Sequence, residues 1–363
     1  MSTTALLEGV EEVTVQTPHF FTRVLHSGPL NAIPVVFIHG NLSSARFFEE
    51  LLAALDPRLH AIAPDLRGFG KAQRLPIDAT RGMRDFSDDL EALLNESSVI
   101  DPDQPVHLIG WSLGGGVAMQ YTIDHPARVA SVTLLSSMSP FGFGGTRDAK
   151  GTPCWDDFAG SGGGTVASEL IERLGVRDVS AESLLSPRQV MRSLYVKSPS
   201  CFTSEREDVL VDELLDIALG DDYYPGDSTS SGNWPGTAPG TRGINNSISP
   251  KYCNLVAFSE ISPKPDVLWV HGDDDLVVSD NSVLDFGVLG GGGIVPGWPG
   301  DDFPPQPMIS QLRNMLLSYE VGGGRVNEER FEDCGHSPHL EHPERFRDLL
   351  TSFIFNADKT HGQ

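Results

Sequence analysis

The stretch VHLIGWSLGGG, residues 106–116, decides the fold. Its first four residues form a mostly apolar run without a charge, which is typical of a strand buried on both faces of a parallel sheet. A helix is predicted to begin at Leu113, directly after the strand. Between them, Gly110, Ser112 and Gly114 fit the pattern G-x-S-x-G, in which a sharp turn holds the serine hydroxyl above a helix N-terminus. We predict that Ser112 is a nucleophile; the alternative is a glycine-rich turn without chemistry.

The same rhythm of strand and helix continues on both sides of this stretch. Alternating strands and helices predict an α/β fold with a mostly parallel central sheet flanked by helices. The predicted strands cover residues 13–17, 20–25, 34–38, 59–63, 106–109, 129–135, 266–270 and 324–332. The predicted helical faces lie within residues 47–55, 86–94, 113–119 and 346–353.

The rhythm stops after Pro140, where the chain becomes rich in Gly, Ser, Asp and Pro. We predict a core of residues 1–139 and 265–363, interrupted by a lid insertion at 140–264. Within the insertion, helices are expected at 166–174 and 209–218, and residues 224–236 are expected to form an irregular loop. A second loop, 287–307, has glycines and prolines dense enough to predict no regular structure.

Two residues far along the chain complete a candidate set for nucleophilic catalysis. His336 follows Gly335 on the loop after the last predicted strand, so it is expected at the same sheet edge as Ser112 and is the predicted general base. His339 and His342 are nearby alternatives that fall towards the following helix. Asp275, the last of three aspartates after the strand at 266–270, is predicted to orient the histidine.

Backbone amides near Ser112 are predicted to stabilise an oxyanion. His39 and Gly40 end a buried strand, and the glycine permits a tight turn towards the region above Ser112. The N–H groups of Asn41 and Leu113 are therefore the predicted oxyanion donors. The alternative is a simple strand-to-helix turn.

Together these motifs resemble the α/β-hydrolase fold family over residues 20–139 and 265–356. The motifs are His39-Gly40, DLRGFG at 65–70, the serine turn, Gly272 to Asp275, and Gly335-His336. The resemblance implies a catalytic triad of Ser112, Asp275 and His336, a lid formed by the insertion, and a structural role for residues 65–70. The sequence departs from the family in its long lid and in the 61 positions (336 − 275) between acid and histidine.

The predicted function is that of a serine hydrolase, a serine esterase or lactonase, which cleaves a carboxylic ester or lactone through an acyl-enzyme intermediate. The substrate is expected to be a medium-sized, largely apolar small molecule. Trp111, Phe141 and Phe143 are the candidate substrate-binding residues. Further aromatic residues of the insertion that could line an apolar pocket are Trp155, Phe158, Tyr195, Tyr223, Tyr224 and Trp234.

Other functions remain open on the same residues. A C–C bond hydrolase, a thioesterase, an acyltransferase or a slow-turnover ligand receptor would use the same triad. Epoxide opening and halogen removal are disfavoured, because those reactions need a carboxylate where Ser112 stands.

The composition and the motifs of the chain limit the classes of partner and cofactor that we expect. The chain has 26 Lys+Arg against 50 Asp+Glu, a net charge of −24, which disfavours nucleic acid and membrane surfaces. No metal-ligand spacing or phosphate loop is found, so no metal and no cofactor is expected. The four cysteines are scattered, which favours free thiols, and Met1–Glu12 lacks the pattern of a secretory signal. A cytoplasmic protein is expected, and a homo-oligomer is left open.

Overall fold

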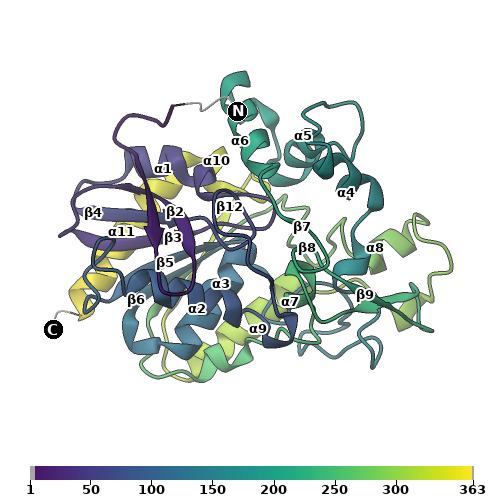
Figure 1. The fold of residues 1–363 in the computed structure, drawn as a ribbon. Coiled ribbons are helices and arrows are strands. Elements are labelled where there is room, and N and C mark those ends of the chain that lie inside the picture. Colours follow the sequence, from purple (N-terminus) through teal and green to yellow (C-terminus); the bar gives the residue numbers. More distant parts are fainter. Residues whose placement is uncertain (1–4, 362–363) are drawn as a thin grey trace.

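A computed structural model describes residues 5–361, and a mostly parallel eight-stranded sheet forms its centre (Figure 1). The strand order is β1-β2-β4-β3-β5-β6-β11-β12; β1 and β2 run antiparallel to their neighbours and the others are parallel. The strands are β1 (Glu11–Gln16), β2 (Phe21–Ser27), β3 (Ile33–Ile38), β4 (Leu59–Pro64), β5 (Val106–Trp111), β6 (Val129–Leu135), β11 (Asp266–Gly272) and β12 (Val326–Phe331). The predicted fold class is confirmed.

The central strands are apolar because helices cover both faces of the sheet. Every residue of β4, β5 and β6 is buried. On one side α1 packs against α11, and on the other α3 packs against α2 and against β5 (Figure 1). The helices of the core are α1 (Glu49–Ala54), α2 (Arg84–Leu94), α3 (Leu113–Asp124), α9 (Met308–Val321), α10 (Pro338–Glu341) and α11 (Pro343–His361).

The register of the parallel strands brings their carboxyl ends to one edge. Ile38 of β3 pairs with Gly110 of β5, and Trp111 of β5 pairs with Leu135 of β6. On the far side of β6, Gly272 of β11 pairs with Phe331 of β12. The loops after β3, β5, β11 and β12, which hold all the predicted catalytic and oxyanion residues, therefore leave the sheet at the same edge.

The chain between β6 and β11 lies beside this sheet (Figure 1). Apart from short 3-10 helices, its elements are α4 (Ser168–Gly175), α5 (Pro187–Val190), a π-helix (Met191–Tyr195), α6 (Ser204–Leu214), β7 (Leu219–Gly220), β8 (Tyr224–Pro225), β9 (Ser228–Ser230), β10 (Thr237–Pro239) and α7 (Ile244–Ser247). Leu174, Met191 and Leu210 belong to the same hydrophobic cluster as the strands of the sheet. The insertion thus shares its core with the sheet, and the lid boundaries at 140 and 264 stay a prediction.

Two predictions of irregular structure were wrong. Residues 224–236 contain β8 and β9, and the predicted loop 287–307 overlaps α8 (Phe286–Gly291) and a 3-10 helix (Gly300–Asp302). The side chain of Asp285 caps α8 by accepting from Gly287 N at 2.7 Å. A Cβ placed on Gly290 would lie 2.6 Å from the Trp298 ring. The glycines here allow a helix to pack closely, and their density alone did not reveal that use.

The structure also bears on the cysteines and on membrane-crossing helices. All four cysteines are free thiols, as predicted. Among residues 5–361, no helix combines the length and apolar character needed to cross a membrane. The first four residues of Met1–Glu12 lie outside the described part of the chain.

Candidate active site

Ser112 sits at the turn between β5 and α3 in a backbone conformation that its neighbours impose. It has φ 56° and ψ −117°, and it precedes the first residue of α3. A Cβ on Gly110 would lie 2.3 Å from the carbonyl oxygen of Gly114, and one on Gly114 would lie 2.1 Å from that of Ile38. Since neither backbone oxygen can move away cheaply, glycine is required on both sides of the serine. The positive φ at Ser112 is the strain expected of such a turn.

Asp275 and His336 meet directly. The Nδ1 atom of His336 lies 2.8 Å from Oδ2 of Asp275, and the two side chains are 3% and 2% exposed. The other carboxylate oxygen, Oδ1, accepts from the backbone N–H groups of Val277 and Val278 at 2.8 and 2.9 Å. Both oxygens are therefore held, and the imidazole presents Nε2 away from the aspartate.

The loop that carries His336, residues 332–337, which we call the histidine loop, is hydrogen-bonded to Trp111, the residue before Ser112. The indole Nε1 of Trp111 donates to the backbone oxygen of His336 at 2.9 Å, and the two rings lie 5.7 Å apart between centroids. Trp111 is 1% exposed. This burial agrees with a packing role, and contact of Trp111 with a substrate stays a prediction.

The loop after β3 lies against Ser112. A Cβ on Gly40 would lie 3.0 Å from Cβ of Ser112. In the described part of the chain the backbone N–H groups of Asn41 and Leu113 donate to no acceptor. These two amides are thus free to bind a ligand oxygen, which is what an oxyanion hole requires.

The alternative histidines are placed differently. His339 is buried among the rings of Phe48 and Trp111, and burial lowers its pKa to about 3. Its ring nitrogens have no hydrogen-bond partner among the described residues. His342 pairs with the backbone oxygen of Asp333. Neither pairs with a carboxylate as His336 does.

The predicted aromatic residues of the insertion are distributed over several places. The ring of Phe141 packs on Gly151, and the amide of Phe143 donates to the oxygen of Ile248 at 2.8 Å. Trp155 and Trp234 pack with Phe303. Contact of Phe141 or Phe143 with an acyl group stays a prediction, whereas the two tryptophans form a cluster with the 286–303 segment.

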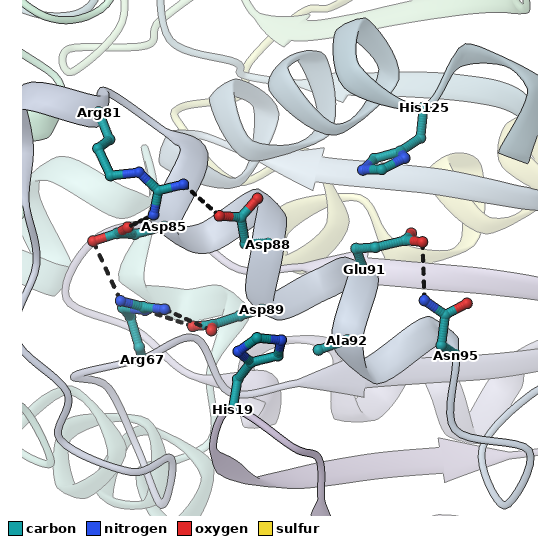
Figure 2. A pocket seen from close by; sticks show the side chains of 10 residues that line it. All are labelled: His19, Arg67, Arg81, Asp85, Asp88, Asp89, Glu91, Ala92, Asn95 and His125. Atoms are coloured by element: carbon teal, nitrogen blue, oxygen red, sulfur yellow. Dashed lines mark hydrogen bonds and ion pairs between the residues drawn. The ribbon is translucent and has the colours of Figure 1, made fainter.

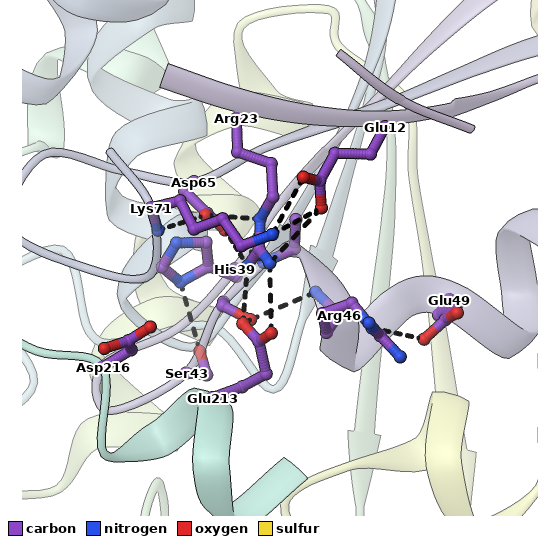
Figure 3. Close-up of polar contacts among 12 residues, drawn as sticks. Glu12, Arg23, His39, Ser43, Arg46, Glu49, Asp65, Lys71, Glu213 and Asp216 are labelled. Atoms are coloured by element: carbon purple, nitrogen blue, oxygen red, sulfur yellow. Dashed lines mark hydrogen bonds and ion pairs between the residues drawn. The ribbon is translucent and has the colours of Figure 1, made fainter. Parts of the chain in front are cut away.

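A network of ion pairs around the buried Arg23 lies next to the loop after β3, residues 39–44, which carries the candidate oxyanion donor Asn41 and is called the oxyanion loop below (Figure 3). Arg23 contacts Asp65 at 2.7 Å and Glu213 of the insertion at 2.5 Å, and its side chain is 1% exposed. Asp65 also accepts from the backbone N–H of Ala45 at 2.9 Å. The motif at 65–70 therefore acts here as an anchor between the sheet, the loop after β3 and α6.

His39 belongs to the same region and is held in one tautomer. Its Nε2 accepts from the backbone N–H of Leu66 at 2.9 Å, so Nδ1 carries the proton and donates to the oxygen of Gly40 at 2.8 Å. Burial lowers the pKa of His39 to about 4. The imidazole is thus neutral, and it fixes the Gly40–Asn41 peptide.

A separate cavity of about 500 Å³ is lined by none of Ser112, Asp275 and His336, although Arg67 of the 65–70 motif lines it (Figure 2). Four carboxylates line it, but Arg67 pairs with Asp89 at 2.5 Å and Arg81 with Asp88 at 2.5 Å. No group of three or more metal-ligating side chains was found in the described range. The residues that line the cavity are His19, Arg67, Arg81, Asp85, Asp88, Asp89, Glu91, Ala92, Asn95 and His125.

Sequence reasoning missed the insertion residues that reach the site. Glu213 bonds Arg23 across 190 positions, and Lys197 bonds Asp274 and Asp333 across 77 and 136 positions. For Tyr195 the sequence predicts only that it is one of several aromatic residues of the insertion that could line an apolar pocket. No local pattern connects residues so far apart.

A strained serine between a buried strand and a helix, with a paired aspartate and histidine on later loops, defines the α/β-hydrolase class of fold and site. The model of the alpha/beta hydrolase family matches residues 35–349. The chain belongs to this family, as the sequence resemblance predicted.

Curated relatives match over part of their length only. A protein provisionally named carbamate hydrolase RutD, from Variovorax paradoxus, is 34% identical over 113 residues, which are 31% of this chain and 41% of that protein. The pimeloyl-[acyl-carrier protein] methyl ester esterase of Aeromonas hydrophila is 35% identical over 107 residues, 30% of this chain and 39% of that enzyme. The match thus spans about two fifths of these relatives.

Solved structures match over nearly the whole fold. One of them, a provisionally named aryl esterase from Burkholderia cenocepacia, covers 96% of this chain and 100% of its own, with a TM-score of 0.60 and 19% identity. At that identity the likeness concerns the fold.

Proposed function

We propose that this protein is a serine hydrolase that cleaves a carboxylic ester or lactone. The observation that carries the proposal is the 2.8 Å bond between His336 and Asp275 on loops that share a sheet edge with Ser112. A buried aspartate that holds a histidine, at the sheet edge where a strained serine also lies, fits the arrangement of a catalytic triad. The names of several relatives and structural neighbours, which include esterases, support the same reaction class.

The proposed reaction uses the side chains and backbone amides of this site. Ser112 Oγ attacks the carbonyl carbon while Nε2 of His336 removes its proton, and Asp275 stabilises the imidazolium. The N–H groups of Asn41 and Leu113 bind the oxyanion. His336 then protonates the leaving alcohol, which leaves an acyl group on Ser112. A water molecule deprotonated by His336 releases the acid and restores the serine.

The substrate class is inferred as a medium-sized, largely apolar ester or lactone. Phe141 and Phe143 follow β6, whose carboxyl end lies at the sheet edge of Ser112; Phe141 is buried and Phe143 is half-buried. We expect kcat/KM on p-nitrophenyl hexanoate or octanoate to exceed that on the acetate at least about tenfold, as burial of several CH₂ groups allows. Equal values along the series would contradict the apolar acyl site. A matched set of lactones distinguishes the two ester classes.

The nucleophile is tested by labelling with a fluorophosphonate probe and measuring intact mass. The wild type should gain one adduct, Ser112→Ala none, and His336→Ala and Asp275→Ala should label slowly. Ser230→Ala, which removes an exposed serine of β9, is the control and should label like the wild type. A folded wild type without an adduct would refute the proposed hydrolase.

A further inference from the structure

Tyr195 of the insertion reaches the loop that carries a candidate oxyanion donor. It is the last residue of the π-helix Met191–Tyr195 and is 7% exposed. Its hydroxyl donates to the backbone oxygens of Asn41 and Leu42, each at 3.0 Å. The ring lies 5.5 Å from that of Trp111 and 6.4 Å from that of His336. One insertion side chain thus contacts the oxyanion loop and lies beside the histidine.

The conformation of the loop fits this single hydroxyl. Leu42 has φ 47°, which is uncommon for a residue with a side chain. In this turn the oxygens of Asn41 and Leu42 converge on the same donor. Burial raises the pKa of the Tyr195 phenol, so the hydroxyl stays protonated and donates at neutral pH. Without it, two carbonyl groups at the site would lose their donor.

Hydrogen bonds from within the same loop hold its first residues, next to the end of β3. The oxygen of Gly40 accepts from the Ser43 hydroxyl at 2.8 Å and from Nδ1 of His39 at 2.8 Å. Because the Gly40 oxygen and the Asn41 N–H belong to one planar peptide, these bonds set the direction of that N–H from one side. Tyr195 holds the peptide that follows, so Asn41 is restrained at both of its peptide bonds.

Tyr195 begins a short segment, residues 195–198, which we call the strap and whose later residues are bonded to other parts of the site. The backbone N–H of Lys197 donates to Oε2 of Glu341 at 2.7 Å, and Oε1 of Glu341 accepts from Gly335 N at 2.7 Å. A Cβ on Gly335 would lie 2.7 Å from Lys197 N, so the strap packs against the histidine loop too closely for a side chain at that position. The ammonium of Lys197 also contacts Asp274, next to Asp275, at 2.7 Å.

We propose that Tyr195 is a positioning residue that aligns the Asn41 N–H for the oxyanion, so that the insertion completes the catalytic apparatus. The proposal rests on the function proposed above. Under this proposal the strap connects the oxyanion loop to the histidine loop through its hydrogen bonds to both sides of the site.

The test is Tyr195→Phe, which removes the hydroxyl and keeps the ring. We expect kcat on p-nitrophenyl hexanoate to fall about 10- to 100-fold, less than the 10²–10³ for loss of a whole donor, because the N–H is displaced and not deleted. KM should stay within about threefold, because substrate contacts are unchanged. The pH profile should keep its apparent pKa values, because the bond between His336 and Asp275 is untouched. The rate of phosphonylation by the fluorophosphonate should fall with kcat.

A matched control is Tyr319→Phe. Tyr319 is a fully buried tyrosine of α9 whose hydroxyl also donates to a backbone oxygen, that of Pro265, just before β11 begins. It lies at the opposite sheet edge from Ser112, so this variant should lose stability without loss of kcat. Thermal unfolding of both variants shows whether the Tyr195→Phe effect is more than lost stability.

A double-mutant cycle with Ser43→Ala gives a second measurement. If both hydroxyls align the same loop, their effects on kcat should be non-additive. An unchanged kcat in Tyr195→Phe, or a rise in KM alone, would overturn the role of Tyr195. The proposed hydrolase activity would not be affected by that result. A shifted pH profile would place the effect on His336 and would overturn the role of Tyr195 too. A wild type that is neither labelled nor active would refute both proposals.

Discussion

Oδ2 of Asp275 lies 2.8 Å from Nδ1 of His336, while its Oδ1 accepts from two backbone amides in its own loop. The two residues are 61 positions apart, on the loops that follow the adjacent strands β11 and β12. Hydrogen bonds within its own loop therefore orient the carboxylate of Asp275 independently of the histidine. A substitution that keeps the bonds of Oδ1 but changes the group that faces His336 therefore tests the proposed orienting role by itself.

Asp275→Asn is predicted to lower kcat by about 10³–10⁴, with a small change in KM. The new side-chain oxygen can keep the amide bonds of Val277 and Val278, but the NH₂ group then faces Nδ1 of His336. The ring would be forced into the tautomer with its proton on Nε2, which cannot accept the proton of Ser112. Steady-state kinetics measures the loss. Asp273→Asn, in the same run of aspartates but paired with Arg330 at the surface, should stay within about twofold; equal losses in the two variants would contradict the assignment.

Gly114→Ala is predicted to disrupt the serine turn. The added methyl would lie 2.1 Å from the oxygen of Ile38, a backbone atom of a central strand. We expect a loss of about 2–3 kcal/mol or more in the free energy of unfolding, and loss of fluorophosphonate labelling. Gly291→Ala is the comparison: its methyl would meet nothing closer than 3.6 Å at the end of α8, so stability should be equal or greater. Denaturant unfolding measures both, and a fully stable, labelled Gly114→Ala would show that the turn tolerates a side chain.

Arg23→Met is predicted to destabilise the protein by about 3–5 kcal/mol, because it removes the guanidinium from the buried carboxylate of Asp65 and the half-buried one of Glu213. Asp65 and Glu213 lie at 2.7 and 2.5 Å from the guanidinium, and together they raise the pKa of Arg23 above its ordinary value. Glu213→Gln should cost less, since Arg23 keeps Asp65. Arg347→Met, which removes a surface pair with Asp348, should leave the unfolding midpoint in place. A similar small effect in Arg23→Met would mean that the buried network contributes little.

Asp285→Asn is predicted to change how stability depends on pH. Burial raises the pKa of the Asp285 carboxyl from its ordinary 3.8 to about 6. The folded state therefore favours the protonated acid, and the stability that this supplies is present below about pH 4 and lost as the pH rises through about 6. Asparagine remains neutral and can still cap α8.

The stability of Asp285→Asn relative to the wild type should therefore increase between pH 4 and 6, by up to about 3 kcal/mol, and then level off. Urea unfolding at a series of pH values measures the difference. Asp301→Asn, at an exposed aspartate, should show a flat difference. A flat result for Asp285→Asn as well would mean that the carboxyl is ionised without cost.

The core of the fold could be predicted because its signals are local. Short, mostly apolar runs such as 34–38 and 106–109 indicate strands buried on both faces, and the glycines on either side of Ser112 mark the turn because they stand between such a run and the start of a helix. Asp275 and His336 could be named because each lies on the loop that follows a predicted strand. The helix α8 was missed because its glycines serve close packing against Trp298, a contact that glycine density does not reveal.

The sequence by itself determined the sheet, the serine turn and which loops carry the acid and the histidine, because periodicity and glycine spacing act over a few residues. Only the tertiary structure decided what the insertion does at the site. Tyr195 meets Asn41 and Leu42 across about 150 positions, and Glu213 meets Arg23 across 190. Such contacts depend on how packed helices bring distant side chains together, and no short pattern encodes them.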